Sequence, residues 1–275
     1  MNCPLCKNKN VINETIFTSF CNNCFIKFSI LEPGIGSSIK GLNYLRKKNY
    51  INILKYLKKF NKKKILDVGC SQGLFVLLAR KHSFKCYGVE PYKSKFLSKI
   101  KNFIYQDSFP FKKKLILNKK FDIIIFNDTF EHIDPLLLDK GINQLKKMLT
   151  TCGLIFINSP SYDGLLYKTA LLLKKLFLIN HFYDRLWQKN MASPHLIYFN
   201  SKSLDIIFKK NGFVNSGNLK IMAMTTYGLL QRIRSSLKSK ILSRLLYIFL
   251  FIFLKFSSST SDIILNVYTL KRNKI

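Results

Sequence analysis

The sequence predicts an α/β protein in which a mostly parallel sheet, covered by helices on both faces, follows a small cysteine-rich module. Two observations predict this. Apolar runs of strand length alternate with helical patterns between residues 62 and 215, as in βαβ units. Four cysteines also form two Cys-x-x-Cys pairs within the first 24 residues. A chain of 275 residues with 48% hydrophobic content accommodates one full domain plus a small appendage.

The two cysteine pairs predict a metal site. Cys3 and Cys6 form one pair, Cys21 and Cys24 form the other, and 14 residues separate the pairs. Each pair offers two thiolates from one tight turn, and tetrahedral Zn²⁺ takes four such ligands. Because all four positions are then filled, we expect a structural zinc ribbon over residues 1–32 that stabilises a module too small for a core of its own.

Residues 33–61 form the predicted connector. Pro33-Gly34 and the Gly36-Ser37-Ser38 stretch are typical of turns. From Tyr44 to Phe60, apolar residues recur near helical spacing, so this stretch predicts a helix that covers the following domain.

The stretch from Lys64 to Phe75 predicts a buried strand, a glycine turn and the start of a helix. A second strand, Cys86–Pro91, carries Glu90, which lies 21 positions after Gly69. This layout is typical of adenosine cofactor sites, because glycines let the backbone approach the ligand and an acid accepts hydrogen bonds from ribose hydroxyls. A dinucleotide turn is disfavoured, because Ser71 and Leu74 replace two of the three glycines that it needs.

The remaining pattern, Asp67-x-Gly69-x-x-x-Gly73, resembles motif I of the class I S-adenosylmethionine (SAM) methyltransferases, with Ser71 in place of the middle glycine. Further strands follow in the order of that family, at Phe103–Asp107, Phe121–Asn127 and Gly153–Asn158, with a helix at Leu136–Leu149. Phe130-Glu-His-Ile133 and His195-Leu-Ile-Tyr-Phe199 resemble the same family. The resemblance covers residues 62–215 and a last strand at Asp262–Leu270, and it implies a Rossmann-like, doubly wound, seven-stranded domain over residues 62–275.

The resemblance also implies roles for individual residues. The turn from Gly69 to Gly73 would hold the methionine end of SAM, Glu90 the ribose and Asp107 the adenine amino group, with Asp128 beside the cofactor. The implied cofactor-binding set is Asp67, Gly69, Ser71, Gly73, Glu90, Asp107 and Asp128. The alternative for Glu90 is a solvated acid at a strand end, and the alternative for Asp107 and Asp128 is an ordinary acid in a strand-end turn.

Two histidines are candidate catalytic groups. His132 lies in the loop after the fourth strand, and His195 follows Pro194. Neutral imidazole can remove a proton near pH 7, which suits methylation of a hydroxyl. The alternatives are structural, a hydrogen bond that braces the loop for His132 and an anchor of the Pro194 turn for His195. Tyr183 and Trp187 could floor an acceptor pocket or belong to a helix core.

The net charge of +32 ordinarily indicates nucleic acid or an anionic membrane. Here only seven of the 46 basic residues are arginines, and the lysines spread along the chain. We therefore interpret the charge as solvated lysine faces, with specific nucleic acid binding disfavoured. An odd number of cysteines, seven, and no secretory signal in residues 1–20 favour a reducing, cytoplasmic location.

Two apolar stretches lie in the second half of the chain. Leu165–Ile179 predicts an amphipathic helix within a lid or acceptor insert at about residues 160–200. Within an amphipathic region at about 229–256, the uninterrupted run Leu245–Leu254 is half of the roughly 20 residues that span a bilayer. This helix either packs on the domain or lies peripherally on the inner face of an anionic membrane. The basic residues that would then face headgroups are Arg232, Arg234, Lys238, Lys240 and Arg244, and the aromatic residues of the same stretch are Tyr247, Phe249, Phe251 and Phe253.

The sequence therefore favours a SAM-dependent methyltransferase that acts, with O-methylation preferred, on a small molecule or a glycan, including a membrane-associated intermediate. An RNA methyltransferase that docks RNA through the ribbon is the first alternative. The ribbon offers few basic or aromatic residues for such contacts, namely Lys7, Lys9, Phe25, Lys27 and Phe28. A catalytically silent scaffold is the second. The acceptor and the oligomeric state stay open.

Overall fold

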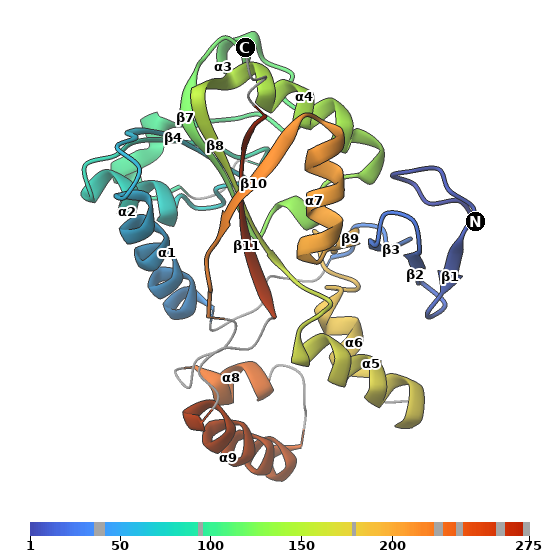
Figure 1. The fold of residues 1–275 in the computed structure, drawn as a ribbon. Coiled ribbons are helices and arrows are strands. Elements are labelled where there is room, and N and C mark those ends of the chain that lie inside the picture. Colours follow the sequence, from blue (N-terminus) through green and yellow to red (C-terminus); the bar gives the residue numbers. More distant parts are fainter. Residues whose placement is uncertain are drawn as a thin grey trace.

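The structure is a computed structural model that describes residues 1–35, 42–92, 96–177, 180–222, 228–234, 239–256 and 262–271. These residues form two sheets, one of seven strands and one of four (Figure 1). Parts of three predicted segments lie outside the described residues: Gly36, Ser37 and Ser38 of the connector turn, Leu178 and Ile179 of the predicted amphipathic helix, and Lys238 of the basic flank. The side chains of Arg232 and Phe253 also lie outside them.

The large sheet has the order β10-β11-β8-β7-β4-β5-β6. Its strands are β4 (Lys64–Val68), β5 (Lys85–Val89), β6 (Ile104–Tyr105), β7 (Phe121–Asn127), β8 (Leu149–Pro160), β10 (Phe213–Asn218) and β11 (Ile263–Leu270). Strands β4 to β8 pair in parallel, while β11 runs antiparallel to both β8 and β10. The predicted seven-stranded α/β sheet is confirmed. The third predicted strand is shorter than expected, because a 3₁₀ helix, η1 (Ser98–Phe103), precedes it.

Helices cover both faces of this sheet (Figure 1). Helices α1 (Asn43–Leu57) and α2 (Leu74–Lys81) pack on one face, and α4 (Leu138–Met148) and α7 (Ser201–Lys210) pack on the other. Alternate residues of each strand serve the two faces, because successive side chains of a strand point in opposite directions. In β7, Ile123 and Ile125 join the α1 and α2 side, whereas Ile124 and Phe126 join the α4 and α7 side.

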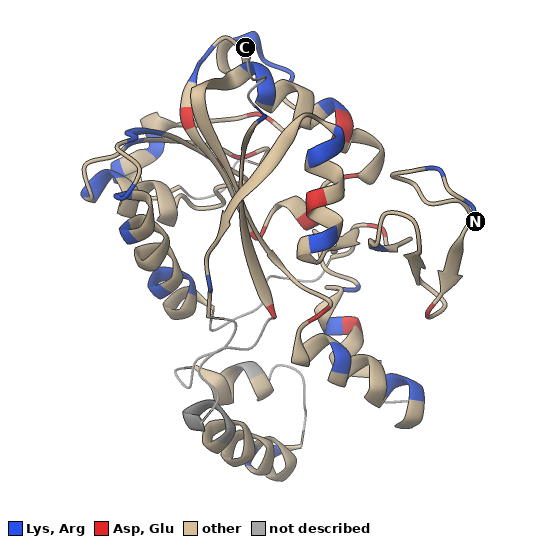
Figure 2. Ribbon diagram, viewed as in Figure 1, with Lys and Arg blue, Asp and Glu red and all other residues tan. Residues whose placement is uncertain are grey.

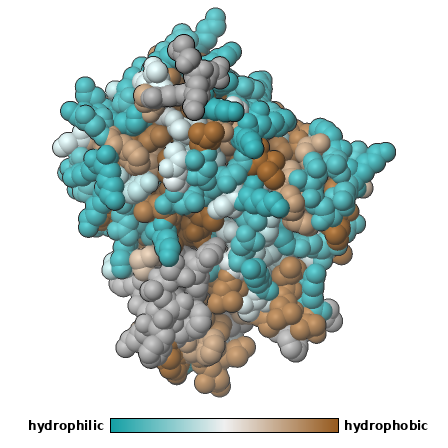
Figure 3. Space-filling model, in the orientation of Figure 1, coloured by the Kyte–Doolittle hydropathy of each residue, from teal (hydrophilic) through white to brown (hydrophobic). Residues whose placement is uncertain are grey.

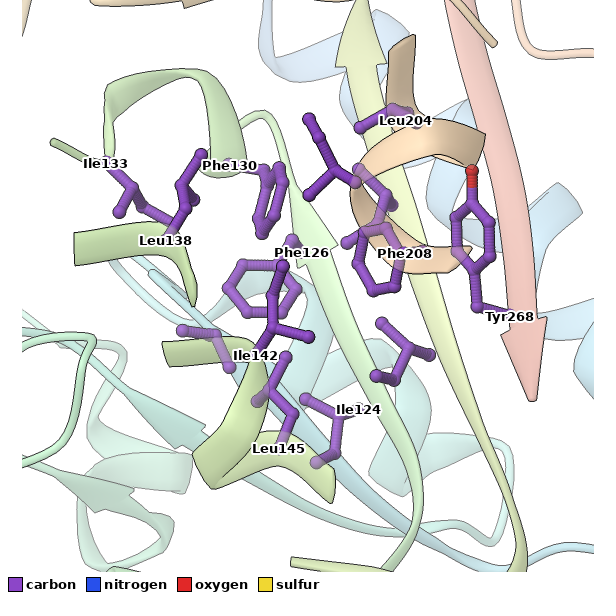
Figure 4. Close-up of a cluster of buried hydrophobic side chains, with 14 of the residues drawn as sticks. Ile124, Phe126, Phe130, Ile133, Leu138, Ile142, Leu145, Leu204, Phe208 and Tyr268 are labelled. Carbon is purple, nitrogen blue, oxygen red and sulfur yellow. The ribbon is translucent and has the colours of Figure 1, made fainter. Parts of the chain in front are cut away.

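The core beside α4 and α7 fixes the loop that follows β7 (Figure 4). Phe130 is fully buried there, with its ring centroid 5.2 Å from that of Phe126 and 5.8 Å from that of Phe208. Phe208 in turn stacks on Tyr268 at 4.1 Å. Burying one such ring stabilises the fold by about 2–3 kcal/mol. The short 3₁₀ helix η2 (Phe130–His132) is therefore held firmly at the end of β7.

The small sheet joins the cysteine-rich module to the large domain. Its strands are β1 (Val11–Asn13), β2 (Thr18–Cys21), β3 (Lys27–Ser29) and β9 (Ile197–Tyr198), in that order. Strand β3 pairs antiparallel with β9, and the Ser29 N–H also donates to the Leu196 carbonyl at 2.9 Å. The ribbon strands thus share a sheet with a segment about 170 positions later in the chain.

The predicted insert contains α5 (Leu165–Phe177) and α6 (Asn180–Leu186). Its core includes Tyr183 and Trp187, both fully buried, together with Phe17 of the ribbon. These two aromatic residues are therefore core residues and do not floor a pocket. Lys27 also lies in this core, ion-paired with Glu14 and with its ammonium group 4.9 Å above the ring of Tyr167.

The burial of Lys27 is an exception to the expected solvated lysine faces. Elsewhere Lys and Arg spread over the outer helices and loops, as expected (Figure 2). The remaining helical elements are α3 (Lys114–Leu117), η3 (Pro135–Leu137), α8 (Leu229–Arg234) and α9 (Lys240–Phe256). Among the described residues, each helix is too short or too polar to cross a bilayer.

Candidate active site

A cavity of about 370 Å³ opens where the parallel strands end, and we call it the strand-end cavity. Carboxyl ends of parallel strands meet at one edge of a sheet, so residues that follow different strands converge there. The cavity is lined by six of the seven predicted cofactor residues, Asp67, Gly69, Ser71, Glu90, Asp107 and Asp128, and by His132. Its volume lies within the range of about 300–1,000 Å³ that is usual for small-molecule sites.

The turn after β4 has the backbone that its glycines predict. Gly69, Ser71 and Gly73 have φ angles of 72°, 50° and 87°, in the left-handed region. Ser71 adopts this conformation at a cost of about 1–2 kcal/mol, whereas glycine would adopt it freely. A Cβ atom on Gly69 would lie 2.3 Å from the Thr129 methyl group. Gly73 is the N-cap of α2 and is not among the residues that line this cavity.

Glu90 follows β5 and is held against this turn. The Ser71 N–H donates to one carboxylate oxygen of Glu90 at 2.9 Å, so the acid and the glycine turn form one unit. Glu90 is buried, and burial raises the pKa of its carboxyl above the ordinary value. A carboxylate can accept about four hydrogen bonds, which leaves capacity for ligand hydroxyls.

Asp67 lies at the base of the turn, almost fully buried. It accepts a hydrogen bond from the Asn127 amide at 3.0 Å. Burial raises the pKa of the Asp67 carboxyl to about 8, although this hydrogen bond opposes the shift. A cationic ligand group nearby, such as the amino group of a methionine moiety, would favour the ionised form.

Asp107 lines the cavity and also holds the loop that follows it. Its carboxylate accepts backbone N–H groups from Ser108 at 2.8 Å, Lys112 at 3.1 Å and Lys113 at 2.9 Å. Through these hydrogen bonds Asp107 stabilises the turn that follows it, a structural role that strand-end acids commonly have. A contact with an adenine amino group would use the remaining capacity of the same carboxylate.

A second cavity, of about 230 Å³, lies beside the first, and we call it the insert cavity. The two cavities share three lining residues, Arg46 and Tyr50 from α1 and Asp128 from the β7 end. Leu166, Tyr167, Leu186 and Tyr198 give the insert cavity apolar walls, and its polar lining comes from Arg46, Asn49, Asp128, Glu131, Asn158, Ser161, Arg185, Gln188, His195 and Asp262. A ligand there would be partly apolar and would carry polar groups.

The two candidate histidines lie on either side of this junction. His132 lines the strand-end cavity and His195 the insert cavity, and their ring centroids are 4.7 Å apart. Burial lowers the pKa of both imidazoles, so both are neutral at pH 7. Nδ1 of His132 donates to the Pro194 carbonyl at 2.8 Å, the loop-bracing contact that was the alternative to a catalytic role.

The four ribbon cysteines converge at one point. Their ligand sulfurs all lie within 4.8 Å of one another, with 3.6 Å between Cys3 and Cys24 and 3.5 Å between Cys6 and Cys21. Four thiolates at about 2.3 Å from a tetrahedral Zn²⁺ would lie about 3.8 Å apart. The donor set and its spacing therefore fit zinc.

Sequence reasoning missed the residues that come from outside the strand ends. Arg46 and Tyr50 were expected only as part of a covering helix, and Tyr198 and Gln188 received no role. Glu131 belongs to the Phe130–Ile133 motif, from which no separate role for this side chain is predicted. Helical spacing at the start of α1 is the signal that could have found Arg46 and Tyr50. The residues that share this face are Leu42, the N-cap of the helix, and Leu45, Arg46, Asn49 and Tyr50.

The sheet order, the glycine turn after its central strand and the acid after the next strand define the class: Rossmann-like class I methyltransferases that use SAM. A family model described as a methyltransferase domain matches residues 42–216, more than half of the chain, so the chain belongs to this family.

Solved structures are similar to this chain at low sequence identity. Mycolic acid cyclopropane synthase CmaA1, complexed with S-adenosylhomocysteine (SAH), is 13% identical with a TM-score of 0.51, over 81% of this chain and 84% of that chain. A SAM-dependent methyltransferase from Archaeoglobus fulgidus is 18% identical with a TM-score of 0.48, over 83% and 97%. The N1-methyltransferase of Burkholderia thailandensis that acts on 1,6-didemethyltoxoflavin is 9% identical with a TM-score of 0.49, over 96% and 100%. No curated protein matches the sequence.

Proposed function

We propose that the protein transfers a methyl group from SAM to a hydroxyl of a small molecule or glycan that binds in the insert cavity. One observation carries this proposal: the strand-end cavity and the insert cavity share Arg46, Tyr50 and Asp128 as a common wall. A cofactor in the first and an acceptor in the second would meet at that wall. Methyl transfer is mainly a matter of such alignment.

The step itself is a displacement. The acceptor oxygen forms a bond to the methyl carbon, the carbon–sulfur bond breaks with its electron pair going to sulfur, and SAH leaves. The hydroxyl must also lose its proton. His132 and His195 are the neutral imidazoles at the junction, so they can take that proton or hold a group that makes its loss easier.

The insert cavity favours a particular chemistry of acceptor. Its apolar walls suit a ring or chain. Arg185 offers a cation to a phosphate or carboxylate, and Arg46 offers a second one beside Asp128, with which it is ion-paired at 3.7 Å. An acceptor that combines an apolar part, an anionic group and a hydroxyl, such as a lipid-linked glycan, fits this lining.

We also propose a structural zinc ion at Cys3, Cys6, Cys21 and Cys24. The sulfur spacing supports it, and with four protein ligands no position stays open for chemistry. Its role would be to hold the ribbon strands, and hence the edge that pairs with β9.

The RNA alternative receives less support from the ribbon. Lys27 and Phe28, two of its five candidate contact residues, are buried against the insert or in the core. Phe25 lies under the ammonium group of Lys202, 3.4 Å from the ring centroid. A ribbon that reads RNA would be expected to present a denser basic and aromatic face.

Incubation with methyl-labelled SAM and separated cell fractions tests the proposed function. We expect label in the small-molecule or lipid-linked glycan fraction, and none with Glu90→Ala protein as the control. Label confined to RNA would instead support the RNA alternative. Absence of transfer, together with no SAH binding by calorimetry, would support the silent scaffold.

We further propose that α9 lies on an anionic membrane surface. Ile241, Leu245, Ile248 and Ile252 are each more than half exposed and recur at helical spacing, and Lys240 and Arg244 are exposed beside them. Apolar side chains gather over this part of the molecule, at the bottom of the view in Figure 3.

Flotation with lipid vesicles tests the membrane proposal. The protein is expected to float with anionic vesicles and not with neutral ones, because the basic residues need acidic headgroups. Ile248→Asp should abolish flotation, whereas Leu115→Asp, at an exposed apolar residue on α3, should not. Equal flotation of both variants would contradict a role for α9.

A further inference from the structure

Three side chains at the junction of the two cavities form a cluster of possible metal ligands. One ligand atom from each of Glu131, His132 and His195 lies within 4.8 Å of the other two. Glu131 and His195 line the insert cavity, and His132 lines the strand-end cavity. The cluster therefore lies where a transferred methyl group would pass between cofactor and acceptor.

The carboxyl group of Glu131 is fully buried without a hydrogen-bond partner for either of its oxygens among the described residues. An ionised carboxylate without partners is unfavourable in the protein interior, so this group takes up a proton unless a cation lies beside it. Phe130 packs into the core and fixes the backbone here, so this arrangement is imposed by the fold. A cation beside Glu131 would hold it in the ionised form.

The imidazole of His132 is arranged as metal ligands commonly are. Its Nδ1–H donates to the Pro194 carbonyl at 2.8 Å, so in the neutral ring Nε2 carries the lone pair. A backbone carbonyl on the second ring nitrogen orients a ligating histidine and fixes its tautomer.

His195 completes the set from a different element. Its Nε2 lies 4.0 Å from a carboxylate oxygen of Glu131, and the same nitrogen accepts a hydrogen bond from the Gln188 amide at 2.9 Å. The lone pair of this nitrogen therefore points to polar partners, and a cation would compete with the amide for it. Its position is set by the segment that leads into β9.

We propose that Glu131, His132 and His195 bind one divalent transition-metal ion, and that this ion binds the hydroxyl oxygen of the acceptor. Two imidazoles and one carboxylate suit Mn²⁺, Fe²⁺, Co²⁺ or Zn²⁺ and leave coordination positions open. The acceptor half of this inference rests on the proposed function, whereas the metal half does not.

A cation at this place has a defined use in the displacement. A hydroxyl bound to a divalent ion loses its proton to water more readily, because the ion stabilises the alkoxide. The alkoxide oxygen then bonds to the methyl carbon as the carbon–sulfur bond breaks. The two histidines would serve by holding the ion, and neither would need to accept the proton.

Accidental metal binding is disfavoured by the composition of this chain. It has 14 acidic residues against 46 basic ones, and its net charge of +32 repels cations. Tight binding of a divalent ion outside the cysteine ribbon would therefore be distinguishable from weak, nonspecific metal binding.

Titration of zinc-loaded, full-length protein with Mn²⁺, followed by the electron paramagnetic resonance signal of free Mn²⁺, tests the inference. We expect one tight Mn²⁺ site per chain. Glu131→Gln and His195→Asn should each weaken it at least about tenfold, since loss of even an outer partner commonly costs that much. Asp262→Asn, at another buried acid of the insert cavity, should bind Mn²⁺ as the wild type does.

A second measurement locates the ion in the wild-type protein and so does not depend on any variant folding. Bound Mn²⁺ should broaden the proton resonances of SAH in the strand-end cavity, and a diamagnetic ion such as Mg²⁺ should not. Each variant is accepted only if it retains SAH binding by calorimetry. No tight Mn²⁺ site, tight binding retained in both variants, or unbroadened SAH would overturn the metal site. Tight Mn²⁺ binding without methyl transfer to any hydroxyl would instead contradict the proposed function and leave the metal site standing.

Discussion

Glu90→Ala is expected to weaken SAM binding by roughly two to three powers of ten. The carboxylate would accept two ribose hydroxyls, and hydrogen bonds to a charged group contribute about 1.5–3 kcal/mol each. A loss of about 3–4 kcal/mol corresponds to that change in affinity. Isothermal titration calorimetry with SAM or SAH measures it.

The same position allows a shape-conserving variant and a charge control. Glu90→Gln keeps an oxygen that can accept the Ser71 N–H, so it should fold as the wild type does and still lose affinity. Asp139→Ala removes one negative charge at an acid that pairs with Lys210 on the surface, and it should bind SAM normally. If Glu90→Ala bound SAM with unchanged affinity, the ribose would lie elsewhere.

The affinity for SAM should also depend on pH, in a direction that is set by the burial of Glu90. The pKa of Glu90 is raised above 4.5, so the folded protein takes up this proton at a higher pH than an exposed glutamate would. Protonation would remove the charge that is expected to bind the ribose hydroxyls. SAM affinity should therefore fall as pH is lowered toward 5, and Glu90→Gln should show less of this dependence.

The strand-end cavity could be predicted from sequence because its residues obey a local rule. Asp67 is the last but one residue of β4, and Glu90, Asp107 and Asp128 follow β5, β6 and β7. Parallel strands end at one edge of a sheet, so these four acids meet there. Knowing the strands and their order was therefore enough to bring the four acids together. Whether each contacts the cofactor as predicted is a matter for binding measurements.

The insert cavity could not be predicted in the same way, because distant segments build it. Arg46 comes from α1, Tyr167 from α5 and Tyr198 from β9, and only packing brings these elements together. The pairing of β3 with β9 could not be predicted from the local sequence. Strand β9 has only two residues, so it shows no alternation of apolar and polar residues. Lys27 shows the same limit, because composition predicts a solvated lysine and long-range packing buries it.

Cys24→Ser is expected to abolish acceptor methylation while leaving SAH binding nearly unchanged. Loss of one ligand of the proposed zinc ion would unfold the ribbon, because small zinc modules depend on the metal for their stability. Strand β9 would then lose its partner β3. Tyr198 of β9 and His195, which precedes the strand, would shift in the insert cavity. Misplacement of about 1 Å can cost roughly a hundredfold in rate. The strand-end cavity belongs to the other sheet and should keep its affinity.

Three measurements separate this outcome from general unfolding. Calorimetry gives SAH affinity, label transfer gives activity, and hydrogen exchange at Leu196–Tyr198 reports release of β9. Cys152→Ser, at an exposed thiol on β8, should match the wild type in all three. If SAH binding and activity fell together, the ribbon would be part of the folding unit of the whole domain. If neither fell, β9 would hold its place without the ribbon, and the metal-stabilised sheet would have no part in shaping the acceptor side.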